Sequence, residues 1–184
     1  MTEAAAETTA RAHSPRVLVS AASRHGATAE IAQAIGQVLS EQGLSVVVIA
    51  PADVRSLDGY DAVIIGSAVY MGHWLDPAKD LVNRFHEALT SRPVWLFSSS
   101  PVGKPSGRLA RSMDQDPADL PGMLEATRAR GHRRFAGKLD RRVLTLPQRA
   151  SLLVFRGLNG DFRDWAEIRR WAESITRQLA LAPR

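Results

Sequence analysis

The chain has 184 residues, of which 45% are hydrophobic, a length and composition typical of one globular domain with a single core. No apolar run approaches the roughly 20 residues of a membrane-spanning helix, and the absence of cysteine excludes disulfides, metal–thiolate sites and cysteine nucleophiles. The net charge of +5 and the pI near 10.4 indicate an anionic partner, whether a membrane surface, a nucleic acid or an acidic small molecule.

The first 15 residues are small, polar and aperiodic, and they lack the long apolar region of a signal peptide. We therefore predict a disordered tail over residues 1–15 and a single domain over residues 16–184. The cysteine-free composition fits a cytoplasmic protein.

An apolar run at residues 17–19 predicts the first strand, and a small polar turn then leads directly into a helix. Apolar residues at i, i+4, i+7 and i+8 spacing indicate the helix, and Gly43 stands where it ends. In such a strand–turn–helix, exposed N–H groups and the helix dipole form an anion site. We predict that residues 20–28 bind the phosphate of a small cofactor. The alternative is a turn that needs small residues for its geometry alone.

Two common phosphate motifs are absent from this turn. The Gly-x-x-x-x-Gly-Lys-Ser/Thr loop of nucleoside triphosphatases is missing, and so is the Gly-x-Gly-x-x-Gly dinucleotide fingerprint. A nucleoside triphosphatase loop and a dinucleotide site are therefore excluded at this position.

Continuous apolar runs predict further strands, as expected for a parallel sheet that is buried on both faces. They lie at residues 46–49, 62–65 and 94–97, and a last strand is predicted at 135–139. Helical patterns separate the strands, so the chain is predicted to be an α/β protein. Its architecture is a doubly wound five-stranded parallel sheet with helices on both faces.

The later helices have recognisable boundaries. Asp76, followed by proline, predicts the N-cap of a helix over residues 76–92, and a short helix is predicted over 118–130. Asp164 and Glu167 form a capping box that opens the last helix. Trp165 and Trp171 on that helix are expected in the core.

Three loops leave the carboxyl ends of the predicted strands, where ligands bind in doubly wound folds. They are residues 20–28, 67–74 and 98–103, and all are rich in serine, glycine and small residues. The middle loop also carries Tyr70 and Trp74, aromatic enough to cover a flat ring.

The acidic residues of a receiver domain and the cysteine of a low-molecular-weight phosphatase or a glutamine amidotransferase are absent. A mononucleotide flavin is the ligand that remains.

Three segments resemble the flavodoxin superfamily, and within it they are most similar to the menaquinone-dependent protoporphyrinogen IX dehydrogenase family. They are SRHGAT at 23–28, GSAVYMGHW at 66–74 and GDFRDWAEIRRWAESI at 160–175. The resemblance implies a flavodoxin-like fold that binds FMN. It also implies that the first loop holds the phosphate, through Ser23, Arg24, His25, Gly26, Ala27 and Thr28. The second loop is then expected to flank the isoalloxazine through Ser67, Ala68, Val69, Tyr70, Gly72 and His73, and the third loop to close its other side through Ser99, Ser100 and Val102.

The function implied is that of an FMN-dependent oxidoreductase, which passes electrons from a reduced organic substrate, such as a porphyrinogen, through FMN to a quinone. The alternatives are a flavodoxin-type electron carrier without its own substrate and a flavin-binding or regulatory protein without turnover. Because the flavin performs the redox chemistry, no catalytic side chain is assigned. His73 either influences flavin protonation or packs beside Trp74, and Arg24 either pairs with the phosphate or points to solvent. His25 and His132 have no neighbours at ligand spacing, so no metal site is expected.

The basic stretch at 104–156 is expected to dock on an anionic partner, above all the membrane in which a quinone resides. The apolar run at 151–158 either enters the membrane surface or folds onto the core. The protein is then cytoplasmic with peripheral contact to the inner face of the cell membrane. No nucleic-acid motif accompanies the arginines, so no nucleic-acid partner is expected.

Overall fold

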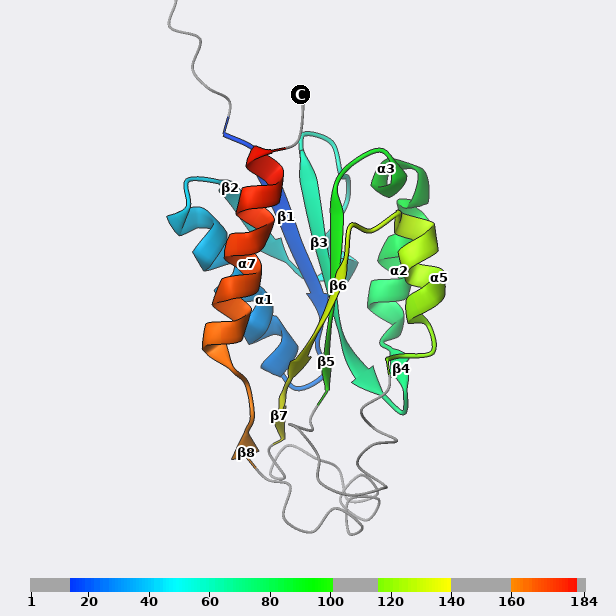
Figure 1. The fold of residues 1–184 in the computed structure, drawn as a ribbon. Helices are drawn as coiled ribbons and strands as arrows, with labels where there is room; N and C mark the ends of the chain where they lie inside the picture. The colour runs from blue at the N-terminus through cyan, green and yellow to red at the C-terminus, as the bar shows by residue number, and fades with distance from the viewer. Residues whose placement is uncertain (1–13, 101–115, 140–159, 182–184) are drawn as a thin grey trace, which may run out of the picture.

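A parallel β-sheet lies at the centre of the structure, a computed structural model that describes residues 14–100, 116–139 and 160–181 (Figure 1). Its strand order within these residues is β2-β1-β3-β5-β6, and all neighbours in this order run parallel. The strands are β1 (Arg16–Ala22), β2 (Ser45–Ile49), β3 (Ala62–Tyr70), β5 (Val94–Ser100) and β6 (His132–Ala136). The predicted doubly wound sheet is confirmed, with its reversal of strand order next to β1 and β3.

Two short antiparallel pairs lie at the ends of these strands, one within this sheet and one as a separate two-stranded sheet. β4 (His73–Trp74) folds back on the end of β3, and β7 (Lys138–Leu139) pairs with β8 (Gly160–Asp161). Both pairs lie at the carboxyl ends of the parallel strands (Figure 1).

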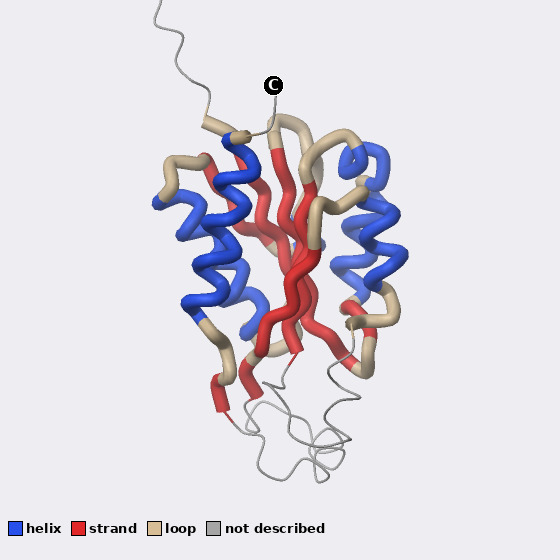
Figure 2. Tube along the Cα trace, viewed as in Figure 1, coloured by secondary structure: helices blue, strands red, loops and turns tan. Residues whose placement is uncertain are grey.

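Helices cover both faces of the sheet, which forms the middle layer in Figure 2. One face carries α1 (Ala27–Glu41) and α7 (Trp165–Ala180). The other carries α2 (Asp76–Arg84), α3 (His86–Thr90) and α5 (Leu120–Thr127), and a short 3₁₀ turn, η1 (Pro51–Asp53), follows β2. Alternate residues of β1 face opposite layers: Val17 and Val19 pack under α1 and α7, whereas Leu18 packs in the second core with α2.

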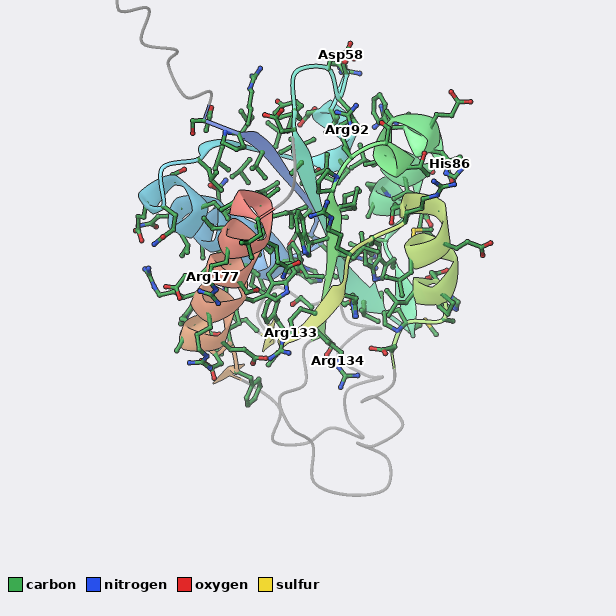
Figure 3. All side chains as sticks on the ribbon, turned by 45° about the horizontal axis from the view of Figure 1, so that its top comes forward. Asp58, His86, Arg92, Arg133, Arg134 and Arg177 are labelled. Atoms are coloured by element: carbon green, nitrogen blue, oxygen red, sulfur yellow. The ribbon has the colours of Figure 1, made fainter. Side chains whose placement is uncertain are left out.

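The last strand begins and ends earlier than the sequence pattern predicts. β6 starts at His132 and stops at Ala136, and residues 138–139 form the separate strand β7. As an edge strand with only β5 beside it, β6 accommodates polar residues. Its Arg133 bonds to Glu167 of α7 at 2.6 Å, and Figure 3 shows Arg133 and Arg134 at the same end of the sheet. A side chain on Gly137 would lie 2.8 Å from the carbonyl oxygen of Ser100, and this close approach separates β6 from β7.

The predicted helix over residues 76–92 is wrong as a single element. The backbone leaves helical geometry at Phe85 (φ −118°), which ends α2 and precedes α3. Arg84 donates from α2 to the carbonyl oxygens of Pro51 and Val54, tying this end of α2 to the turn after β2. The N-cap is Leu75 rather than Asp76, which is the first helical residue and pairs with Lys79 at 2.8 Å.

The capping box of the last helix is confirmed in part: the Asp164 carboxylate accepts the Glu167 N–H at 2.9 Å, but the Glu167 carboxylate accepts from Arg133. Trp171 packs edge-on against Phe97 and Phe135 beneath α7, as expected of a core residue. The prediction for Trp165 is wrong, because its side chain is 44% exposed. Trp165 is the first residue of α7 and stacks on the guanidinium of Arg163.

At the amino end, the structure describes the chain from Ser14 onward. The hydroxyl of Ser14 donates to the carbonyl of Gly43, and the carbonyl of Pro15 accepts from Ser45 N–H at 3.1 Å. Residues 14 and 15 therefore already contact the domain, and the rest of the predicted tail lies outside the described residues. Within the described ranges, no helix has the length and apolar character needed to cross a membrane.

Candidate functional site

The three predicted loops meet at the carboxyl ends of neighbouring strands. Register places Ala22 of β1 beside Ser67 of β3, and Ala68 of β3 beside Ser99 of β5. The first loop, the turn of the β3–β4 hairpin and the end of β5 therefore form one edge of the sheet (Figure 1). Val102 lies outside the described residues.

The first loop presents the start of α1 without a side-chain cap. Gly26 is the N-cap in left-handed geometry (φ +86°), and no side chain caps the first turn of α1. Thr28 is buried, whereas Arg24 and His25 are exposed. A β-carbon on Gly26 would meet only a Glu30 oxygen at 3.9 Å. The loop thus has open space above uncapped N–H groups, the arrangement that a phosphate requires.

The second loop is a hairpin whose tip is strained and exposed. β3 runs to Tyr70, turns through Met71 (φ +50°) and Gly72 (φ +81°), and returns as β4. Met71 is 94% exposed. Glycine accepts this backbone geometry without cost, but Met71 does so at a cost of about 1 kcal/mol or more. The tip is therefore held in place by contacts elsewhere in the hairpin.

Trp74 supplies the main anchor of the hairpin. Its indole is buried, and its Nε1–H donates to the Ser98 hydroxyl at 2.9 Å. The Ser67 hydroxyl accepts the backbone N–H of Leu75, also at 2.9 Å. The sequence predicts that Trp74 helps to cover a flat ring, whereas the structure places its side chain in the core beneath the hairpin. Ser67 likewise supports the hairpin from below.

His132 extends the anchor to the edge strand. Its Nε2 lies 2.8 Å from the Ser98 Oγ, which also accepts the Trp74 indole N–H. Burial lowers the pKa of His132, because the charged imidazolium loses its hydration there. In the neutral form, Nε2 accepts the Ser98 proton and completes a chain of two hydrogen bonds beneath the site.

His73 sits at the exposed end of the hairpin and faces a carboxylate. Its Nδ1 lies 3.1 Å from Asp119 Oδ2, and the same carboxylate accepts the Trp74 backbone N–H at 2.8 Å. Burial alone raises the pKa of Asp119, but the hydrogen bonds from Trp74 and His73 outweigh it and hold the pKa below its usual value. Sequence reasoning missed Asp119. Its position before a helical pattern is its only local signal, and it suggests nothing more than a cap.

Arg24 connects the first two loops. Its guanidinium lies over the Tyr70 ring, 4.8 Å from the centroid, within the range of a cation–π contact. The sequence leaves open whether Arg24 pairs with the phosphate or points to solvent. The described contact is instead with the loop expected to flank the ring. The first loop and the hairpin are thus in direct side-chain contact.

The remaining predicted residues lie where the third loop begins. Ser99 is buried and Ser100 half-buried at the end of β5. Val69 pairs with Trp74 in the hairpin. The loops are completed by Ser23, Ala27 and Ala68. Within the described residues, the Ser23 hydroxyl makes no hydrogen bond. No group of three or more His, Cys, Asp or Glu side chains in residues 14–100, 116–139 and 160–181 is arranged to hold a metal ion.

Fold and loop geometry together define a doubly wound α/β domain whose described loops converge at its switch point. A family model described as "Flavodoxin domain" matches residues 18–163, and the chain belongs to this family. The search of curated proteins gives no match.

Solved structures with the same fold include both small flavodoxins and larger enzymes. A flavodoxin from the domain Archaea is 17% identical with a TM-score of 0.61, and the match covers 90% of this chain and 99% of that chain. Flavodoxin 1 of Bacillus cereus is 17% identical with a TM-score of 0.57, with coverage of 88% and 97%. The Flv1 flavodiiron core of Synechocystis sp. PCC6803 is 15% identical with a TM-score of 0.64, and the match covers 94% of this chain but only 38% of that chain.

Flavodoxin domains bind FMN, so the cofactor expected from the sequence is confirmed at the level of the family. The described residues fit this cofactor, because an uncapped helix start with a left-handed glycine stands beside a hairpin that carries Tyr70. The coarse function follows: this is an FMN-binding redox protein.

Proposed function

We propose that the protein is an FMN-dependent oxidoreductase that passes electrons from a reduced organic substrate to a quinone. The observation that carries this proposal is the His73–Asp119 pair beside the hairpin, with the imidazole 57% exposed and its Nδ1 fixed at 3.1 Å from the carboxylate. Dehydrogenation of a carbon substrate releases protons as well as electrons. An exposed histidine that is oriented by a carboxylate is suited to act as a general acid or base.

FMN supplies the electron-transfer chemistry when it is bound. The residues of the chain bind and orient it. The N–H groups at the start of α1 and the Thr28 hydroxyl hold the phosphate, and the Trp74–Ser98 bond fixes the hairpin that flanks the ring. Asp119 accepts the Nδ1 proton of His73. The Nε2 atom is thereby left to exchange a proton with the substrate.

A porphyrinogen is the substrate we propose, on the sequence resemblance of residues 23–28, 66–74 and 160–175. Positive charge around the site supports a substrate with carboxylates. Arg24 stands in the first loop, and Arg134 of β6 lies beside Ser98 of β5. Such charges favour association with an anionic molecule.

The test is to load the purified protein with FMN and follow oxidation of protoporphyrinogen with a menaquinone analogue. We expect turnover that falls in His73→Gln, while the affinity for FMN stays unchanged. Tyr60→Phe is the matched control, because Tyr60 lies in the loop before β3 at the opposite end of the sheet. Bound FMN without turnover contradicts the oxidoreductase proposal.

The second candidate is an electron carrier, and a specific observation favours it. The match to the archaeal flavodoxin runs over 99% of that protein, and the match to the flavodoxin of Bacillus cereus over 97%. A carrier exchanges electrons with a reductase and a protein acceptor and needs no substrate pocket. Rapid reduction by a flavodoxin reductase, together with no oxidation of the porphyrinogen, selects this candidate.

We further propose that the protein contacts the membrane peripherally through the basic stretch 104–156, of which the structure describes residues 116–139 and not the remainder. Each basic residue near an anionic bilayer contributes about 1 kcal/mol, and salt weakens this attraction. Sedimentation with anionic and neutral liposomes at low and high salt tests the proposal. Binding only to the anionic liposomes at low salt is expected. Equal and negligible binding to both contradicts it.

A further inference from the structure

Arg163 is a buried arginine held between two carboxylates at the start of α1. Its side chain is only 3% exposed, and its Nη1 donates to Glu30 Oε2 at 2.6 Å. Its Nε donates to Asp161 Oδ1 at 2.7 Å, and its Nη2 bonds to the second oxygen of the same carboxylate. The guanidinium holds the pKa of Asp161 below its usual range. Trp165 covers its flat face at 4.4 Å.

The first partner of Arg163 stands beside the phosphate loop. Glu30 is the acidic residue in the first turn of α1, and its Oε1 lies 3.9 Å from where a β-carbon on Gly26 would be. Arg163 Nη1 also reaches the carbonyl oxygen of Ala27 at 3.4 Å. A carboxylate this close to the loop repels a phosphate dianion unless a cation offsets its charge. Arg163 pairs with this carboxylate and also with Asp161, so it reduces the charge of the two carboxylates from −2 to −1.

The same segment also reaches the third loop. Phe162 N–H donates to the carbonyl oxygen of Gly137 at 3.1 Å, and Gly137 N–H donates to that of Ser100 at 2.6 Å. Residues 160–163 therefore connect the end of β5 with the start of α1. The segment thus joins the first loop, which Arg163 contacts, to the third loop, which Phe162 reaches through Gly137.

We infer that Arg163 is a positioning residue for FMN: it offsets the charge of Glu30 beside the phosphate and fixes the first loop relative to the third. This inference rests on FMN binding at this site. It predicts that loss of Arg163 weakens binding of the phosphate more than binding of the ring. Riboflavin, which lacks the phosphate, separates the two contributions.

The experiment measures dissociation constants of FMN and riboflavin by quenching of flavin fluorescence. We compare Arg163→Met, Arg163→Lys, Glu30→Gln and the double variant R163M/E30Q. We expect R163M to bind FMN at least about tenfold more weakly, the size of one lost charge-assisted interaction, with little change for riboflavin. R163K keeps the charge but not the fork that holds two carboxylates, and we expect an intermediate loss. In the double variant most of the FMN affinity returns.

Arg169→Met is the matched control. Arg169 also joins α7 to α1, through Glu41 at 2.9 Å, but at the last residue of α1 and with both side chains exposed. We expect wild-type affinity for both flavins in this variant.

Hydrogen exchange of the cofactor-free protein supplies a readout that is independent of FMN. We expect faster exchange of the Glu30 amide, which donates to the Gly26 carbonyl oxygen at 2.9 Å, in R163M and unchanged exchange in Arg169→Met. Unchanged exchange and unchanged FMN affinity in R163M overturn the inference, and so do equal losses of FMN and riboflavin that Glu30→Gln does not reverse. A wild-type protein that binds no FMN overturns the proposed function instead, while the exchange rates still decide on Arg163.

Discussion

The first loop and the hairpin of the site are held in opposite ways. No side chain caps the start of α1, so its N–H groups remain open to a ligand. The hairpin instead rests on one buried hydrogen bond, from Trp74 to Ser98, and on two partly buried ones, from Leu75 to Ser67 and from Trp74 to Asp119. An anion needs unoccupied donors, whereas a flat ring needs a wall that does not move. The first loop offers unoccupied backbone N–H groups, and the hairpin is fixed by hydrogen bonds that involve side chains.

Removing the hairpin anchor is the largest change that we expect. Trp74→Ala deletes a buried indole and leaves the Ser98 hydroxyl without its donor, at a cost of about 3–5 kcal/mol in the free energy of unfolding. Trp165→Ala is the control, because this exposed tryptophan contributes mainly its stacking on Arg163, about 1 kcal/mol. Urea denaturation measures both variants. Equal losses contradict the assignment of Trp74 as the anchor.

Closing the first loop is expected to lower the affinity for FMN in addition to the stability of the fold. Gly26→Val places a branched side chain at φ +86°, which costs about 1–3 kcal/mol, and fills the space above the helix start. Gly43→Val introduces the same strain at φ +85°, at the other end of α1. We expect similar losses of stability in both variants, but a loss of FMN affinity of at least tenfold, or about 1.4 kcal/mol, only in Gly26→Val. A matching loss of affinity in Gly43→Val places the phosphate elsewhere.

Asp119→Asn tests the outer anchor of the hairpin and gives a pH-dependent signal. The folded-state pKa of Asp119 lies below its unfolded value, so its ionised form contributes stability above the unfolded pKa of about 3.9. This contribution disappears as the pH falls through the folded pKa. We expect the variant to lose about 1 kcal/mol at pH 7 and progressively less in acid. The control Asp58→Asn removes an exposed carboxylate, and a pH-independent loss in D119N contradicts the assigned role.

Ser20→Ala is expected to have the smallest effect, and in the stabilising direction. The Ser20 hydroxyl is buried in β1 and has no hydrogen-bond partner within the described residues. Removing it gains up to about 1 kcal/mol. Ser67→Ala is the contrasting variant, because it leaves the Leu75 N–H without its acceptor and lowers stability. Thermal unfolding of both variants decides whether the two serines differ in this way.

Local pattern predicted the sheet and the location of the site, because apolar runs and their ends are encoded by neighbouring residues. Val17, Val63 and Leu96 belong to such runs, and the loops that follow them converge by topology alone. The role of Asp119 could not be predicted from local pattern, because its partner His73 lies 46 residues away along the chain. Trp74 was misjudged for the same reason: its aromatic character is visible in the sequence, but the Ser98 hydroxyl that holds it in the core is not. Phe85 interrupts its helix although no proline or glycine marks the position.

The anchors of the hairpin also bear on the order in which the protein folds. Trp74 depends on Ser98, 24 residues further along the chain, and on Asp119, 45 residues further. Contacts between distant residues form only after the intervening chain has been brought together, which slows their formation. We therefore expect the wall of the flavin site to form after β5 and α5 have docked. A chain that emerges from the ribosome then acquires its phosphate loop early and its ability to enclose the ring late.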